Sequence, residues 1–247
     1  MLGLVVIGLD GTRWLELLRA APAWLAFALV ALAFAGLYFG AAFAGLGLRR
    51  VLPGRTIDGR PLKPRQVRDE VLRSLVSIGV FGLYGVVVVK LLAAGLLAFT
   101  WQAPWWVVAG DLAVLMLWNE VHFYACHRLL HTAWLMKRVH YVHHLSLVPT
   151  PFSTYSFHWF EAALLGSVML LALPFRSFHV VAVLLLPLGS ITLNVLGHWN
   201  WDPVPGLSDG ALPATSRRHS AHHARGEGNL GFLLPWFDRA LRTRVTR

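Results

Sequence analysis

The chain has 247 residues, of which 56% are hydrophobic and only 14% charged, with a mean hydropathy of +0.57 and a formal net charge of +10. This composition excludes an ordinary soluble domain and is typical of a polytopic membrane protein. The single cysteine, Cys126, excludes an intrachain disulfide and a cysteine-based zinc site. Excess basic charge in a membrane protein first indicates topology and contact with anionic lipid, so we expect no nucleic-acid partner.

Long apolar runs predict the membrane-spanning helices, because a spanning helix needs about 20 mainly apolar residues. Residues 1–20 are apolar but carry four charged side chains, which argues against a cleavable signal peptide and favours a short interfacial helix. Three spans follow, and then a helical hairpin that Pro174 breaks: residues 22–48, 71–99, 104–126, and 160–174 with 177–197. The first arm of the hairpin is short for a full crossing, so a re-entrant or tilted helix also fits.

Basic residues predict the orientation, because cytoplasmic segments carry an excess of Lys and Arg. Segment 49–73 holds eight basic residues and the segment after residue 198 holds seven, whereas the linkers 100–103 and 174–177 hold only Arg176. Nineteen of the 22 basic residues are arginine, which is typical of GC-rich bacterial genomes and favours a bacterial inner membrane. We therefore expect these segments to face the cytoplasm: 49–70, 127–159 and 198–247.

Three histidine clusters carry the chemistry. They hold eight of the twelve histidines: His127 and His131; His140, His143 and His144; and His219, His222 and His223. Helix positions i, i+3 and i+4 lie on one face, so we expect each cluster to point its imidazoles at one spot. All three clusters fall on the predicted cytoplasmic side, as a shared metal site requires. Imidazole suits iron, zinc, copper or nickel, and eight ligands are too many for one ion and about right for two.

Three further residues could complete the site. His198 ends the last span on the same side as the clusters and is a candidate ninth ligand. Glu120 lies seven residues before His127 on the same helix face, and it could orient an imidazole or simply be solvated at the membrane edge. Asn194 shares a helix face with His198, and it could bind a metal through water or simply satisfy a helix neighbour.

The remaining histidines are expected to be structural. His122 lies about 140° around the helix from His127, so we expect it to pack rather than to bind metal. His158 has no partner at ligand spacing, and we expect it to pair with Glu161. His179 falls on the opposite side of the membrane, and we assign it no role.

The ligand set favours redox chemistry over hydrolysis. A hydrolytic zinc site usually has an open position and a carboxylate base, and this chain contains no H-E-x-x-H motif. A pair of irons can instead take up electrons, bind O2 and abstract hydrogen from an unactivated C–H bond. A site placed against a bilayer suggests a lipid substrate that arrives sideways from the hydrocarbon.

These motifs resemble those of the fatty acid hydroxylase/sterol desaturase superfamily of integral-membrane di-iron enzymes. The resemblance rests on H-x3-H at 127–131 and on H-x2-H-H at 140–144 and at 219–223, and it covers about residues 105–245. The surrounding residues also resemble the family pattern: Tyr124–Arg128, the stretch 149–161, and Asn229, Gly231, Trp236, Asp238, Arg239 and Thr243.

The resemblance implies two Fe ions as cofactors and O2 as the co-substrate. Zinc binds imidazole more tightly than Fe²⁺, so it can displace iron in purified protein. No fused haem domain fits in the chain, which implies a separate electron donor such as a ferredoxin, a cytochrome b5 or a reductase.

We therefore expect an all-α polytopic membrane protein with four or five spanning or half-spanning helices and a cytoplasmic helical cap that holds the metal site. Residues 1–104 would form an interfacial segment and two transmembrane helices, and residues 105–247 a fatty acid hydroxylase-like catalytic domain.

The expected function is O2-dependent hydroxylation or desaturation of a lipid, such as a sterol or a fatty acyl chain. The alternative is a membrane metal-binding or transport protein without oxidase activity, which would place polar ligands inside several spans. For the oxidase we also expect an apolar cavity that runs from between the spans to the histidines. Gly166 and Gly197 are the candidate small residues in its wall.

Overall fold

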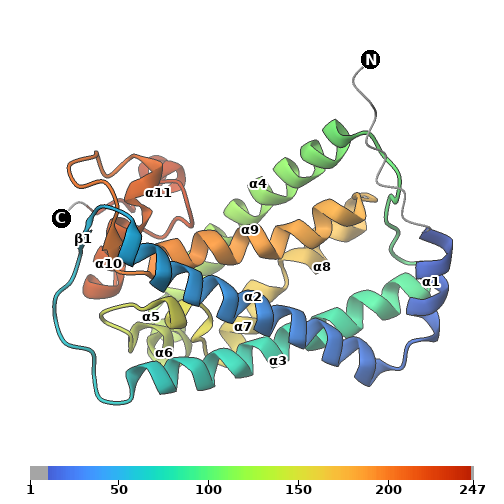
Figure 1. Ribbon diagram of the computed structural model, residues 1–247, viewed down its shortest axis with the longest axis horizontal. Helices are drawn as coiled ribbons and strands as arrows, with labels where there is room; N and C mark the ends of the chain where they lie inside the picture. The colour runs from blue at the N-terminus through green and yellow to red at the C-terminus, as the bar shows by residue number, and fades with distance from the viewer. Residues whose placement is uncertain (1–10, 246–247) are drawn as a thin grey trace.

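The computed structural model describes residues 11–245, which form a mostly helical protein (Figure 1). The α-helices are α1 (Gly11–Ala20), α2 (Ala23–Val51), α3 (Gln66–Ala93), α4 (Trp105–Leu130), α5 (Ala133–Leu135), α6 (Tyr141–His144), α7 (Trp159–Gly166), α8 (Val168–Ala172), α9 (Val180–His198), α10 (Thr215–Arg225) and α11 (Trp236–Ala240). A π-helix spans Met136–His140, and 3-10 helices span Pro151–Tyr155, Leu173–Phe175 and Leu212–Ala214. Two short strands, β1 (Arg55–Thr56) and β2 (Trp201–Asp202), pair antiparallel. The expectation of a helical fold is confirmed.

Three of the described helices, α2, α3 and α9, are long and apolar enough to cross a membrane. They occupy three of the predicted spans, namely 22–48, 71–99 and 177–197. These runs contain few charged residues, and each helix exceeds or approaches the length that a bilayer crossing needs. The protein is therefore described as a membrane protein.

The other two predicted crossings are helical but less apolar or shorter. Helix α4 fills the predicted span 104–126, yet Asp111, Asn119 and Glu120 interrupt its apolar run, and it is not among the three candidate spans. The predicted arm 160–174 is divided into α7, α8 and a 3-10 turn that contains Pro174. The count of four or five crossings therefore remains a prediction.

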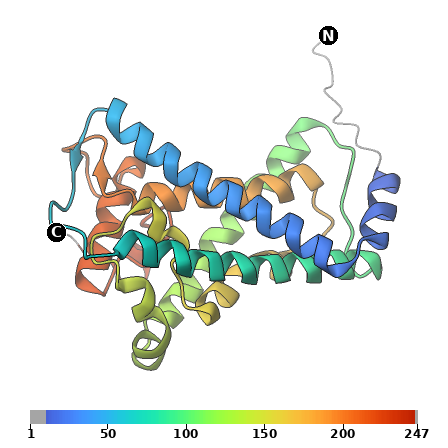
Figure 2. The same ribbon diagram turned by 60° about the horizontal axis from the view of Figure 1, so that its bottom comes forward.

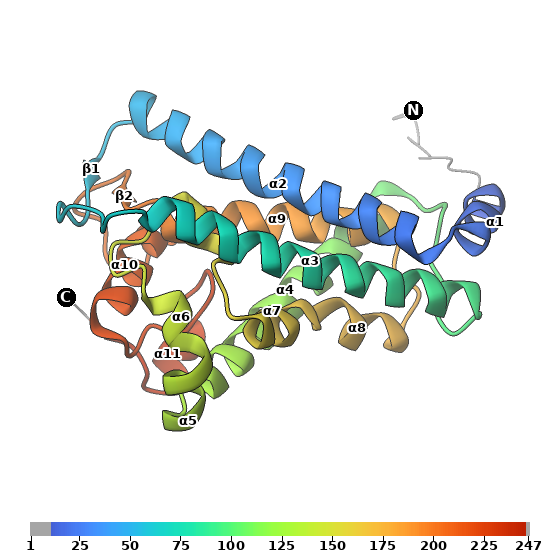
Figure 3. The same ribbon diagram turned by 90° about the horizontal axis from the view of Figure 1, so that it is seen from below.

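The long helices form an elongated bundle with different structures at its two ends. Helices α2 and α3 pack against each other toward the α1 end and diverge toward the α10 end, and α9 packs against both α2 and α4 (Figure 3). Helix α1 lies at one end of the bundle, while α10 and α11 lie at the other (Figures 1 and 2). Helices α4 and α9 both run toward the end that carries α10, so their C-terminal histidines arrive at the same place.

Two buried apolar clusters hold the bundle together. Near α10 the cluster includes Tyr38, Phe81 and Ile191, which bring together α2, α3 and α9. Toward α1 the cluster includes Leu115 and Leu186, which join α4 to α9. Within a bilayer, such contacts stabilise the bundle through van der Waals packing rather than through removal of apolar surface from water. The clusters therefore set the mutual positions of the helices that carry the histidines.

A buried polar network attaches the segment after α6 to the bundle. Glu70, at the start of α3, is fully buried and accepts hydrogen bonds from Ser146 Oγ at 2.7 Å and Thr150 Oγ1 at 2.5 Å. Gln66 Nε2 also donates to Glu70 at 2.8 Å and to the Val148 carbonyl at 2.9 Å. These contacts fix the loop that follows the second histidine cluster.

Candidate metal centre

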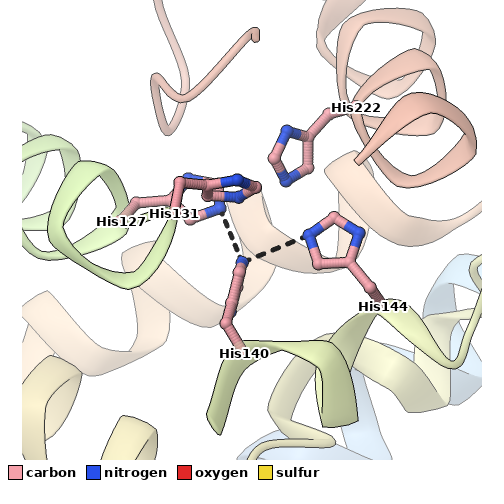
Figure 4. Close-up of side chains that lie close together, drawn as sticks. All are labelled: His127, His131, His140, His144 and His222. Carbon is pink, nitrogen blue, oxygen red and sulfur yellow. Dashed lines mark hydrogen bonds between the residues drawn. The ribbon is translucent and has the colours of Figure 1, made fainter. Parts of the chain in front are cut away.

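Nine histidine side chains meet at the α10 end of the bundle and form two adjacent groups. In each group the candidate ligand nitrogens all lie within 4.8 Å of one another. We call the first set group one and the second set group two: His127, His131, His140, His144 and His222; and His143, His198, His219 and His223. Figure 4 shows the imidazoles of group one converging from three separate segments of the chain. All nine predicted ligand candidates are thus brought together, His198 among them.

The expectation that each cluster points at one spot holds for His127 and His131, which both belong to group one, but it is wrong for the two H-x2-H-H clusters. Successive helical residues are about 100° apart around the axis, so two adjacent histidines point in different directions. His144 therefore joins group one while His143 joins group two, and His222 and His223 divide in the same way. Each H-x2-H-H motif contributes to both groups.

In group one the Nε2 atoms converge on a common point. His140 Nε2 lies 3.2 Å from the Nε2 atoms of both His127 and His144. The Nε2 atoms of His131 and His222 are buried and have no hydrogen-bond partner among the described residues. Buried polar nitrogens without partners are costly, so this arrangement points to a cation between them.

Three of the Nδ1 atoms in group one, those of His127, His140 and His222, point outward to fixed acceptors. His127 Nδ1 donates to the Leu230 carbonyl at 2.8 Å, and His222 Nδ1 donates to the Gly228 carbonyl at 2.6 Å. His140 Nδ1 donates to Glu161 Oε1 at 2.8 Å. With the proton on Nδ1, the Nε2 atoms of His127 and His140 both present lone pairs, so their contact is not a hydrogen bond. The donor set fits a metal ion that takes imidazole ligands.

Glu161 is the functional residue that the sequence reasoning assigned wrongly. Its expected partner was His158, but its carboxylate lies against His140, and both side chains are almost fully buried. His158 instead caps α7, where its Nδ1 accepts the Phe160 backbone N–H at 3.2 Å. The sequence does show that Glu161 is the one carboxylate in an apolar segment, and a charge in such a position needs a buried partner.

Group two is built from the ends of α6, α9 and α10. His198 Nε2 lies 3.3 Å from His143 Nε2 and 2.9 Å from His219 Nε2. His223 Nε2 lies 3.1 Å from His219 Nε2. His198 Nδ1 donates to the Asn194 backbone carbonyl at 2.9 Å, which directs its Nε2 toward the group. Four imidazoles in this arrangement also fit a metal ion.

Burial keeps the histidines of both groups neutral. Desolvation, reinforced by neighbouring imidazoles, lowers the pKa of His219, His222 and His223 well below the ordinary value. The same causes lower the pKa of His144 to about 3, and desolvation lowers that of His131 to about 4. Neutral imidazole is the form that binds metal, so the groups are ready for ligation at neutral pH.

Glu120 has neither of the two roles considered for it, since its carboxylate does not orient an imidazole and is not solvated at the membrane edge. It is buried and accepts the backbone N–H groups of Leu233 and Leu234 at 3.2 Å. Asp238 similarly accepts the N–H groups of Leu230 at 2.7 Å and Gly231 at 2.9 Å. The two carboxylates therefore hold the loop whose carbonyl groups bind the histidine Nδ1 atoms. The Glu120 side chain contacts this loop rather than the histidines because the loop packs against the face of α4 that carries Glu120.

Asn194 acts through its backbone, as the acceptor for His198, and its side chain lines a cavity. His122 packs as expected, with its Nε2 3.1 Å from Ser167 Oγ, and Cys126 is buried beside it. His179 caps the N-terminus of α9, whereas His198 ends the same helix. The 19 residues of α9 separate the two by about 28 Å, so His179 lies far from both groups.

An apolar cavity of about 360 Å³ occupies the bundle between α2, α3, α4, α7 and α9. Its wall includes Phe123, whose ring centroid lies 5.0 Å from that of His127, and Phe157, whose ring lies 5.1 Å from that of His143. One layer of aromatic side chains thus separates the cavity from each histidine group. Gly166 lines the cavity as expected, but Gly197 does not, because it faces the His219 ring.

Comparison with known proteins gives a consistent result. The family model for fatty acid hydroxylase matches residues 112–243, more than half of the chain and including all nine histidines. The chain is 30% identical over 151 residues to a very-long-chain aldehyde decarbonylase of Oryza sativa, and 28% identical over 131 residues to a delta(7)-sterol 5(6)-desaturase of Schizosaccharomyces pombe. It is 26% identical over 140 residues to methylsterol monooxygenase 1 of Gallus gallus.

These alignments cover 55%, 52% and 56% of this chain but only 24%, 38% and 47% of the respective relatives. The chain therefore spans less than half the length of each of these proteins. No solved structure matches it.

Proposed function

Because the chain belongs to the fatty acid hydroxylase family, we propose that it is a membrane-bound oxidoreductase that uses O2 and two electrons to hydroxylate or desaturate a lipid. The observation that carries the proposal is the position of two buried histidine groups at the end of an apolar cavity. The bundle helices supply the apolar wall, and the ligands come from the C-terminal ends of α4 and α9 together with the segment 131–144 and α10.

Each group would hold one iron ion, with five imidazoles for the first and four for the second. Two bound irons would supply the reduction of O2 that oxidation of an unactivated C–H bond requires. Glu161 and the carbonyls of Gly228 and Leu230 hold the protons of His140, His222 and His127 on Nδ1, which leaves the Nε2 atoms of these three imidazoles free to bind. Glu161 also places a carboxylate behind His140, which makes that imidazole a stronger ligand.

The cavity walls favour a lipid over a water-soluble substrate. Phe123 and Phe157 lie between the cavity and the histidines, and they exclude water from the side that the substrate would occupy. Extracting a lipid into water costs about 0.8 kcal/mol per exposed CH2, so access from the bilayer is cheaper than access through water. The named activities of the relatives, on sterols and very-long-chain aldehydes, favour the same substrate class.

The histidine end would face the cytoplasm of a bacterial inner membrane. Arg49 and Arg50 end α2 at this side, and the basic residues of 49–73 and of the C-terminal segment lie on it as well. A separate ferredoxin, cytochrome b5 or reductase would deliver the electrons there.

The alternative is a metal transporter, and the geometry does not favour it. A transport path needs polar ligands distributed through several spans. All nine candidate ligands lie together at one end, whereas the described wall of the cavity is mostly apolar. The ion-binding groups therefore lack a polar route through the bundle.

Mass spectrometry of lipids tests the proposal. The wild-type chain and a His140→Ala, His222→Ala variant are produced with iron in the same aerobic bacterial host, and their lipid extracts are compared. The proposal predicts a lipid that has gained one oxygen atom or lost two hydrogen atoms with the wild type alone. Identical extracts from the cells that produce the wild type and the variant, also after supplementation with sterols and long-chain lipids, would overturn it.

A further inference from the structure

Among the described residues, two buried nitrogens in the wall of the apolar cavity have no hydrogen-bond partner: Trp101 Nε1 and Asn119 Nδ2. Of the two, Asn119 lies on α4, the helix that also carries His127. Asn119, on α4, lines the cavity and is 7% exposed. Its Nδ2 is buried and has no hydrogen-bond partner among the described residues. Its Oδ1 accepts a hydrogen bond from Ser190 Oγ, across on α9, at 3.5 Å. The Ser190 contact orients the amide, so that the free N–H2 group is the part left for a ligand.

The neighbouring polar side chain in the cavity wall is already paired. His122 Nε2 lies 3.1 Å from Ser167 Oγ, so it is not the hydrogen-bond partner of Asn119 Nδ2. A buried water needs two to four polar partners, and the cavity wall is mostly apolar. An oxygen atom carried by a lipid can accept from Asn119 while the rest of the molecule fills the apolar space.

Two lines of residues lead from this polar pair to the two histidine groups. On α4 they are Asn119, Phe123 and His127, and on α9 they are Ser190, Asn194 and His198. Residues spaced by four lie on nearly the same helix face, so both lines border the cavity side of the bundle. Asn119, Phe123, Ser190 and Asn194 all line the cavity.

Both lines have the same length. Eight residues separate Asn119 from His127 and Ser190 from His198, which corresponds to about 12 Å along each helix. The Asn119–Ser190 pair therefore lies at one level of the bundle, and the histidine groups lie at another. A lipid whose oxygen atom is bound at the Asn119–Ser190 pair would therefore place a carbon at a fixed distance along its chain next to the histidine groups.

We propose that Asn119 is a specificity-determining residue that binds an oxygen atom of the lipid substrate through its Nδ2. The substrate class is a long-chain or polycyclic lipid that bears a hydroxyl, ether, ester or carbonyl oxygen remote from the carbon that is oxidised. This inference rests on the proposed function for the identity of the histidine site, but the binding of the oxygen is measurable without turnover.

Matched lipid pairs test the binding. Hexadecan-1-ol is compared with hexadecane, and cholesterol with cholestane, on the detergent-purified protein. The dependence of the thermal midpoint on lipid concentration gives an apparent affinity for each lipid. Loss of the hydrogen bond leaves the buried donor unpaired, so the oxygen-bearing member of at least one pair should bind about tenfold tighter.

Two variants assign the preference to Asn119. Asn119→Leu keeps the side-chain size but removes the donor, and it should bring the affinity ratio in that pair close to one. The control is Thr192→Val, which removes a hydroxyl from the exposed face of α9 that bonds only its own helix at the Leu188 carbonyl. The control should keep the ratio of the wild type. If Asn119→Leu lacks a cooperative unfolding transition, Asn119→Ala replaces it in the same comparison.

The result is decisive in either direction. Equal affinities within both pairs, no measurable binding of any of the four lipids, or a preference that survives loss of the amide would overturn the inference. Lipid products measured on the same iron-loaded preparations separate it from the proposed function. If oxidised lipids form but neither pair shows an affinity difference, the proposed function stands and the role of Asn119 is removed. If the oxygen-bearing lipid binds tighter but no oxidised lipid forms, the role of Asn119 stands and the proposed function is removed.

Discussion

His143 and His144 are adjacent in the chain, yet their rings belong to different histidine groups. His143 Nε2 lies 3.3 Å from His198 Nε2 in group two, whereas His144 Nε2 lies 3.2 Å from His140 Nε2 in group one. His222 and His223 divide in the same way. The two groups therefore share the helices that carry them, so a shift of α6 or α10 moves ligands of both.

Replacing Glu161 by Gln should weaken metal binding in group one. The amide oxygen can still accept the proton of His140 Nδ1, but the negative charge behind the imidazole is lost. Removal of such a supporting carboxylate typically costs about 10–100-fold in metal affinity. Competition with a chelator measures the affinity of each bound ion, and the ion in group two should keep its wild-type value.

The matched control for this change is Glu227→Gln, at an exposed position outside the contacts of His140. It should leave both affinities unchanged. Equal weakening of both ions by Glu161→Gln would argue against the assignment of Glu161 to group one.

Gly166→Ala should narrow the range of accepted lipids before it affects the metal content. A Cβ at this position would lie 3.0 Å from the rings of Phe81 and Tyr84, which also line the cavity. The rings must then shift, at a cost of about 1–3 kcal/mol for an overpacked site. The relative conversion of lipids of increasing chain length, measured together with iron content, checks this outcome.

Gly197→Ala is the comparison for that variant. Its Cβ would make an ordinary contact, 3.7 Å from the His219 ring, and it does not face the cavity. We expect it to keep the wild-type order of lipid preference. A change of preference in Gly197→Ala as large as in Gly166→Ala would mean that the cavity does not select the substrate.

The metal-free protein should lose stability as the pH falls below about 6.5. Burial lowers the pKa of His131 to about 4 and that of His144 to about 3 in the folded state, whereas both have ordinary values near 6.5 when unfolded. Between these values the unfolded chain binds protons that the folded chain does not, so acid favours unfolding. The stability that the neutral histidines contribute is thus fully present above pH 6.5.

Thermal midpoints of the metal-free protein between pH 7.5 and about 4 test this dependence. His131→Phe removes one of the depressed groups and should give a shallower decline. A midpoint that stays level across the range would contradict the buried, neutral state of the histidines.

Much of the site could be predicted because ligand chemistry leaves a pattern in the sequence. The three clusters were recognised from spacing, His198 from its place at the end of the last predicted span, and the spans 22–48, 71–99 and 177–197 from apolar length. The division of each H-x2-H-H motif between two groups was not predicted, because it depends on how α6 and α10 cross α4 and α9. Spacing shows which side chains share a helix face but not which neighbour that face meets.

Other parts of the site leave no such pattern. The carbonyls of Gly228 and Leu230 are backbone groups, and any residue type supplies them. Glu120 was correctly placed on the face of His127, but a loop from the far end of the chain takes its hydrogen bonds. Glu161 lies 21 residues from His140, and only the fold shows that the two meet.

Counting iron ions per chain is the most direct test of the claim that the two groups form a two-metal centre. Elemental analysis of protein produced with ample iron and without added zinc should give about two ions for the wild type and for His179→Ala, which lies at the opposite end of α9. The double variant His143→Ala, His223→Ala leaves two imidazoles in group two, and the double variant His140→Ala, His222→Ala leaves three in group one. Each double variant should retain about one ion. A wild type that binds one ion or none, or double variants that both retain two, would contradict the account.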